Sequence, residues 1–177
     1  MGYANKLRAL FPDISLQPED LFLLEAFQVN YLPERVPPRE FATLLRTFPI
    51  LQRFLVAKYP GISSFFERIL EEQDAFEDQD LIDKECQEAL WEIADLIVYN
   101  KYPQRFDSNA PIRWELKELT AITPLEGKVI ADVGAGSGRI SFMVAPWAQT
   151  VFAVEPVSTR SSIIRKVPLL SFSSIEL

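Results

Sequence analysis

The sequence contains no histidine and only one cysteine, Cys86. The absence of histidine excludes a Ser-His-Asp triad and removes the usual general base and the commonest zinc ligand. A single cysteine excludes a disulfide within the chain, so we expect a reducing, cytoplasmic setting. Because Cys86 lies among charged neighbours in "DKECQEAL", we predict a structural thiol rather than a reactive one.

Long apolar runs are also absent. No stretch approaches the roughly 18 uninterrupted apolar residues of a membrane-spanning helix, and the first residues lack the layout of a signal peptide. The net charge of −7 disfavours both a nucleic-acid backbone and an anionic membrane as partners. The acidic segment 71–80 has no glycine for the sharp turn of a calcium loop, so no metal site is expected there.

Residues 1–105 have the pattern of an all-helical domain interrupted by prolines. Apolar residues recur at helical spacing in four segments, and this domain carries the acidity of the chain. Pro18 is expected at a helix start, Pro49 is expected to kink or split a helix, and Ser63 or Ser64 is expected to cap another. The longest predicted helix lies within 80–102.

Residues 106–177 have a different pattern, in which short apolar runs alternate with helical segments. This part has no net charge. A helix over 112–122, with Trp114 available for burial, precedes a β-α-β-α order that is typical of a parallel sheet. The fold class is therefore α/β, with a helical first domain and a partial second domain. The expected elements are a buried strand at 129–134, a helix at 137–148, a strand at 149–156, a helix at 157–166, and at most one short strand near the end.

The stretch "VIADVGAGSGRIS" joins the first predicted strand to its helix through three alternating glycines. Glycine permits the positive φ of a sharp turn and lets a ligand approach the backbone, while the helix start offers free N–H groups. Three known patterns fail on spacing: the phosphate loop lacks its Lys-Ser or Lys-Thr, the dinucleotide fingerprint has Arg139 in its last place, and the nucleophile elbow has Ala135 where glycine is required.

The remaining pattern is an acid, one spacer and G-x-G-x-G. It resembles motif I of the class I S-adenosylmethionine-dependent methyltransferases, and Glu155 stands where that family carries an acid at the end of the second strand. The resemblance implies a Rossmann-like domain and S-adenosylmethionine as cofactor. Glu155 would accept hydrogen bonds from the ribose hydroxyls, and Asp132 would hold the loop and reach the amino group. The implied cofactor-binding residues are Asp132, Gly134, Ala135, Gly136, Ser137, Gly138 and Glu155.

The same resemblance places four aromatic residues in the segment that packs over the cofactor in many such enzymes. In amphipathic helices, aromatic residues more often belong to the core. These residues are Tyr99, Tyr102, Phe106 and Trp114.

The resemblance covers about residues 112–166, and nothing in the sequence matches the later strands of the family, which border the methyl acceptor. We therefore expect the front portion of a methyltransferase, truncated after the second strand and helix, with no catalytic residue assigned. Three functions stay open: methyl transfer to a small-molecule or protein acceptor, a non-catalytic remnant, and a helical interaction module with a vestigial loop. An exposed edge along "KVIADV" predicts a homo-oligomer unless the first domain covers it.

Overall fold

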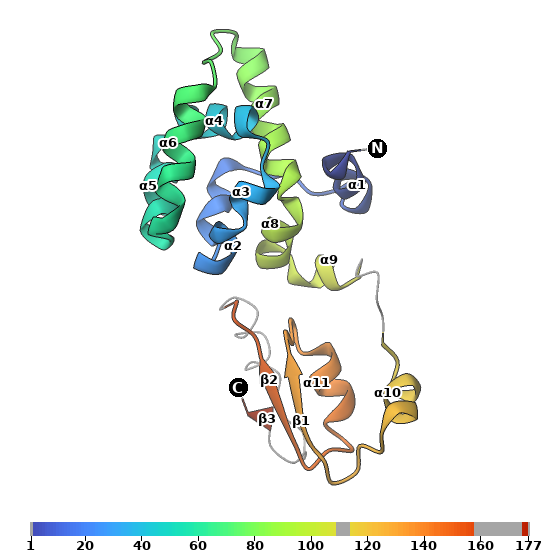
Figure 1. Ribbon diagram of the computed structural model, residues 1–177. Helices are drawn as coiled ribbons and strands as arrows, with labels where there is room; N and C mark the ends of the chain where they lie inside the picture. Colours follow the sequence, from blue (N-terminus) through green and yellow to red (C-terminus); the bar gives the residue numbers. More distant parts are fainter. Residues whose placement is uncertain (1, 109–113, 158–174, 177) are drawn as a thin grey trace. The chain divides into compact units, whose positions relative to one another are not determined.

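The computed structural model describes residues 2–108, 114–157 and 175–176, which form two compact units divided between Tyr102 and Pro103. The sequence predicted the boundary three residues later, between 105 and 106. The first unit is helical, and the second combines three helices with a small parallel sheet (Figure 1). Within the described ranges, no helix has the length and hydropathy needed to cross a bilayer.

The first unit consists of short helices, several of which have a proline in their first turn. Proline is tolerated in the first helical turn but not in a helix interior. One amphipathic pattern is accordingly divided at Phe48 into two helices, as predicted for Pro49. The elements are α1 (Tyr3–Leu10), the 3-10 helix η1 (Pro18–Leu23), α2 (Ala26–Asn30), α3 (Leu32–Arg35), α4 (Pro38–Thr47), α5 (Pro49–Lys58), the 3-10 helix η2 (Pro60–Ile62), α6 (Ser63–Glu72), α7 (Gln79–Glu92) and α8 (Ala94–Lys101).

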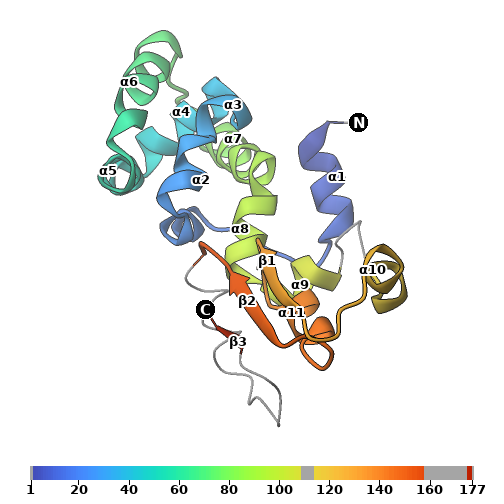
Figure 2. The ribbon, with the colours of Figure 1, turned by 60° about the horizontal axis from the view of Figure 1, so that its bottom comes forward.

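The core of this unit lies between α4, α6 and α7, which lie side by side in both ribbon views (Figures 1 and 2). Phe41 and Phe66 are fully buried, with ring centroids 5.9 Å apart. Buried leucines at the predicted helical spacings extend the core to η1 and α5, and Ile62 of η2, which was not predicted, is buried as well. The leucines include Leu21, Leu24, Leu44, Leu45, Leu51 and Leu55.

Two details of the helical prediction are wrong. No side chain caps α6, because Ser63 is already in the helix and its hydroxyl contacts the Glu67 carboxylate at 2.8 Å. The long helix predicted over 80–102 is interrupted at Ile93, where the backbone leaves the helical region and α8 begins. The buried side chains of α7 and α8 nevertheless follow the predicted spacing, with Ala89, Ile93 and Ile97 fully enclosed.

The second unit is built around two parallel strands joined by a helix. Val129 pairs with Thr150 and Val133 with Val154, so five residues of each strand are in register. A two-residue strand pairs in parallel with the other side of the second strand, which gives the order β1-β2-β3. The elements are α9 (Pro103–Ser108), α10 (Leu116–Ile122), β1 (Val129–Val133), α11 (Arg139–Val144), β2 (Thr150–Val154) and β3 (Ile175–Glu176).

A small apolar cluster holds this unit together. Val151 is fully buried beneath Val144 and Ala148, and Leu119 of α10 packs against the same cluster. Figure 1 shows α11 running alongside β1. The strand–helix–strand prediction is confirmed, whereas the helix predicted over 157–166 falls largely on residues outside the described part of the chain.

The prediction that the first strand is buried is wrong. Only alternate side chains of β1 face α11, and Val129 and Val133 on the opposite face are 62% and 79% exposed. Trp114, expected to be available for burial, is 44% exposed because it precedes the first turn of α10. An apolar run therefore does not imply a buried strand when none of the described helices packs on one face of the sheet.

Candidate cofactor-binding loop

The candidate site is the loop Gly134–Gly138, which connects the end of β1 to α11. Gly134, Gly136 and Gly138 have φ values of 79°, 62° and 86°. These φ values lie in the left-handed region, which residues that have a Cβ adopt only under strain. The sequence pattern of alternating glycines is thus explained by backbone conformation.

Backbone hydrogen bonds fasten this loop to the end of β2. The N–H groups of Gly134 and Ala135 both donate to the carbonyl of Val154, at 2.8 and 3.1 Å, and the Gly138 N–H donates to the Ala135 carbonyl at 2.8 Å. The loop therefore has a defined shape at the carboxyl ends of both strands, where open α/β sheets place their ligands.

Asp132 anchors the helix that follows the loop. Its Oδ2 accepts hydrogen bonds from the Ser141 backbone N–H at 3.0 Å and from the Ser141 hydroxyl at 2.7 Å. Ser141 is completely buried. Asp132 thus positions α11 relative to β1. Ser141 was not selected from the sequence, although a hydroxyl in the first turn of the helix could have indicated a partner for Asp132.

Glu155 lies directly against the loop. One carboxylate oxygen accepts the Gly136 N–H at 2.7 Å, and the other accepts the Val157 N–H at 2.8 Å. The fold therefore places Glu155, the acid at the end of the second predicted strand, against Gly136, which is predicted to bind the same ligand. This contact spans 19 residues of sequence.

A further acid reaches the loop from α9. The Ser137 hydroxyl donates a hydrogen bond to the Asp107 carboxylate, so α9 and the loop are in direct contact within the second unit. Sequence reasoning did not select Asp107, because a lone acid in a short helix has no periodic or spacing signal. Phe106, its neighbour, is half-buried.

The charges around the loop restrict its ligand. Asp107, Asp132 and Glu155 all contribute carboxylates, whereas Arg139 after the last glycine is exposed. Carboxylates repel phosphate and accept hydrogen bonds from hydroxyl and ammonium groups. The loop therefore suits a ligand that is rich in donors or positively charged. Within the described ranges, no group of three acidic or cysteine side chains has an arrangement suited to a metal ion.

The aromatic residues are distributed over both units. Tyr99 and Tyr102 belong to the first unit, and Trp114 is exposed before α10. Of the four, Phe106 is in α9, the helix that touches the loop through Asp107.

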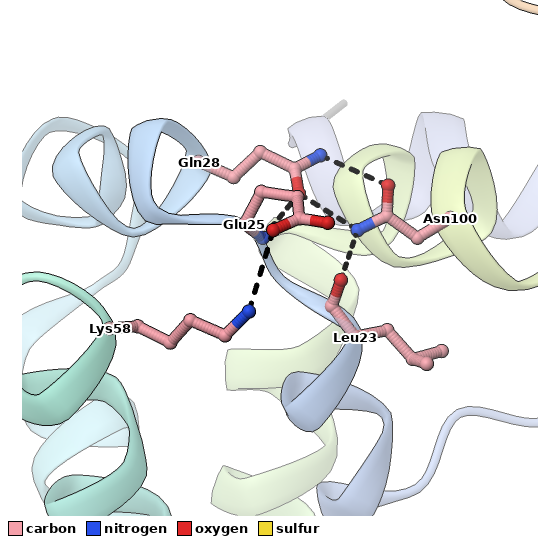
Figure 3. Close-up of polar contacts among 5 residues, drawn as sticks. All are labelled: Leu23, Glu25, Gln28, Lys58 and Asn100. Atoms are coloured by element: carbon pink, nitrogen blue, oxygen red, sulfur yellow. Dashed lines mark hydrogen bonds and ion pairs between the residues drawn. The ribbon is translucent and has the colours of Figure 1, made fainter. Parts of the chain in front are cut away.

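A second polar cluster lies within the first unit, where it joins α2, α5 and α8 (Figure 3). The Asn100 amide donates to the Leu23 carbonyl and to Gln28 Oε1, both at 2.8 Å, and Gln28 donates back to Asn100 at 3.2 Å. Glu25 donates its N–H to Gln28 and pairs with Lys58 at 3.4 Å. No buried polar side-chain atom among the described residues is left without a partner. This cluster is a structural network of the helical fold.

Cys86 is buried in the first unit, 5% exposed, with its sulfur 3.9 Å from the Thr47 hydroxyl. Burial raises the pKa of the thiol. The location agrees with the structural role predicted from sequence.

No protein-family model, curated protein or solved structure matches this chain.

Proposed function

We propose that the second unit binds S-adenosylmethionine at the loop Gly134–Gly138 and that the chain is of the methyltransferase type. One contact supports this proposal most directly. The carboxylate of Glu155, at the end of β2, lies on the N–H of Gly136, the central glycine of the loop. The two parts of the resemblance, separated in sequence, thus meet at one place.

The residues present fit such a ligand. A methyl group built on Gly134 would meet no atom within 4 Å, so space is open beside the first glycine. Each oxygen of a carboxylate accepts two hydrogen bonds. Glu155 is therefore able to accept from ribose hydroxyls while it holds the Gly136 and Val157 N–H groups. The bound cofactor would supply an activated methyl group.

The roles of the two other acids follow from their contacts. Asp132 fixes α11 through Ser141, which positions the loop, and both of these hydrogen bonds end on its Oδ2, so the predicted role toward the amino group stays with its other oxygen. Asp107 is close enough to the loop to accept from that ammonium group, because it already contacts Ser137. A positively charged ligand also suits the three carboxylates of the site.

The methyl acceptor is proposed only as a class. The first unit is acidic and compact in its own right, which favours a basic protein or small molecule over nucleic acid. The second candidate function is a non-catalytic remnant, in which the loop retains cofactor affinity without turnover; the contacts described above assign residues to the cofactor and none to a methyl acceptor. Binding of cofactor with no methyl transfer to a panel of acceptors would favour this second function.

The test is calorimetric titration of the whole chain with S-adenosylhomocysteine. Glu155→Ala removes two charge-assisted hydrogen bonds to the ribose and should weaken binding by about 3 kcal/mol, a hundredfold or more. Glu126→Ala, an exposed acid in the turn before β1, is the matched control and should bind like the parent. Absence of binding to the parent chain, or tighter binding of ATP than of S-adenosylhomocysteine, would contradict the proposal.

A further inference from the structure

The outer edge of β1 combines unpaired backbone with apolar side chains. Lys128 and Gly134, at either end of the strand, direct their backbone groups to β2: the Lys128 carbonyl accepts from Thr150 and the Gly134 N–H donates to Val154. Because backbone direction alternates along a strand, Val129, Ala131 and Val133 direct their N–H and C=O groups to the opposite edge. No described strand pairs with that edge.

The side chains of the same three residues form an uncharged row. Val129 and Val133 are strongly exposed, and Ala131 between them is exposed as well. Phe152 and Val154 of β2 continue this apolar face and are 37% and 50% exposed. Natural sheet edges are usually protected by charged residues, proline or bulges, and this row has none of them.

A groove of about 520 Å³ lies beside this edge on the other side of the sheet. It is lined mainly by apolar side chains from α10, β1 and α11, including Leu119, Ile122, Ile130 and Ile140. Ile122 is 70% exposed. Apolar surface is thus available on both faces of the sheet beside the outer edge of β1.

The residues of β1 are arranged symmetrically about Ala131. Suppose that a second β1 pairs in antiparallel orientation, with Ala131 of one copy opposite Ala131 of the other. Val129 of each copy then lies opposite Val133 of the other copy. All three outward-directed residues then form hydrogen-bonded pairs, with about six backbone hydrogen bonds in total. An interface in which the same residues meet on both subunits is the kind that closes into a two-fold dimer.

Charge favours the same register. Lys128 of one copy is a diagonal neighbour of Asp132 of the other, at about 7–8 Å, on the face that carries α11. Moving the register so that Asp132 is the centre would place two acids directly opposite each other. Centring the pairing on Ile130 instead would place Val133 of one copy opposite Gly127 of the other, and Gly127 lies in the turn before the strand.

We propose that two copies of this chain pair through β1, antiparallel and centred on Ala131, and form a continuous six-stranded sheet. The partner is a second copy because the strand matches itself in hydrogen-bond register and in charge. This interface does not depend on cofactor binding.

Cysteine crosslinking tests the register. In a Cys86→Ser background, Ala131→Cys should form a disulfide between copies under mild oxidation, because hydrogen-bonded antiparallel pairs have Cα atoms about 5.5 Å apart. Val129→Cys is the matched control on the same face. Its equivalents would be four residues apart along the pair, about 13 Å, and should not crosslink. Crosslinking of Val129→Cys as efficient as that of Ala131→Cys would overturn the proposed register.

Sedimentation velocity of the whole chain over a concentration series tests the dimer. Ala131→Lys places like charges opposite each other at an exposed position and should raise the dissociation constant at least about tenfold. Thr150→Lys is the control, because Thr150 lies on the same face of the sheet but in β2 and not at the outer edge of β1. It should leave the dissociation constant within about threefold of the parent value. A monomeric parent at every concentration, or a dimer equally stable in Ala131→Lys, would overturn the proposal. Circular dichroism of each variant verifies that it folds.

Discussion

The bond between Asp132 and Ser141 yields the sharpest stability prediction. Both hydrogen bonds from Ser141 end on the same oxygen of Asp132. An asparagine can place its amide oxygen at that position, so Asp132→Asn should preserve the geometry and remove only the charge. A hydrogen bond to a charged group contributes about 1.5–3 kcal/mol and a neutral one about 0.5–1.5. With allowance for the half-buried carboxylate, we expect a loss of about 2 kcal/mol in the free energy of unfolding of the second unit.

Asp132→Ala should cost more, about 3–4 kcal/mol, because it leaves the buried N–H and hydroxyl of Ser141 without an acceptor. Ser141→Ala removes only the hydroxyl bond and should cost about 1–2 kcal/mol. The two alanine changes together should cost less than the sum of their separate effects, with a coupling energy of about 1–2 kcal/mol. Such coupling would distinguish a direct bond from a general loss of charge.

The assay is urea unfolding followed by the fluorescence of Trp147, which comes shortly after α11. Replacing Trp91 and Trp114 by phenylalanine leaves Trp147 as the sole tryptophan and makes the signal specific to the second unit. Glu126→Gln, an exposed acid, is the control for removal of one negative charge. Equal stability of Asp132→Asn and Glu126→Gln, or zero coupling in the double variant, would refute the anchoring role of Asp132.

Four further results are expected. Asp107→Ala should release α9 from the loop and speed tryptic cleavage after Arg105 about tenfold, and an unchanged cleavage rate would contradict the contact with Ser137. Asn100→Ala should lower the free energy of unfolding of the helical unit by about 2–4 kcal/mol in thermal melts, because it leaves buried partners unsatisfied; a loss below 1 kcal/mol would argue against the network. Cys86 should react with a thiol reagent at pH 8 at least about a hundredfold more slowly in the folded chain than in denaturant. Because burial raises the pKa of this thiol, its contribution to stability should be complete below the ordinary thiol pKa and should fall as pH rises above it, which urea titrations between pH 7 and pH 10 measure.

Local patterns in the sequence were sufficient to predict the strand–helix–strand order and the glycine loop. Alternating glycines after an apolar run are typical of a sharp strand-to-helix turn, and the three glycines of this loop have the positive φ values that such a turn uses. The division of a helix at Pro49 is equally local, since the proline ring cannot continue the preceding helix. In both cases, the backbone conformation is determined by a few residues that are adjacent in the sequence.

Features that depend on distant residues could not be predicted in this way. The contact of Asp107 with Ser137 joins residues 30 positions apart, and no spacing rule links a short helix to a loop so far away. The exposure of Val129 and Val133 also escaped prediction, because an apolar strand has the same sequence whether or not another layer covers it. Asp132 and Glu155 could be selected from sequence as site residues. That the first holds a helix and the second lies on the loop was decided by the tertiary structure alone, because a carboxylate bonds whichever donors the fold brings within reach.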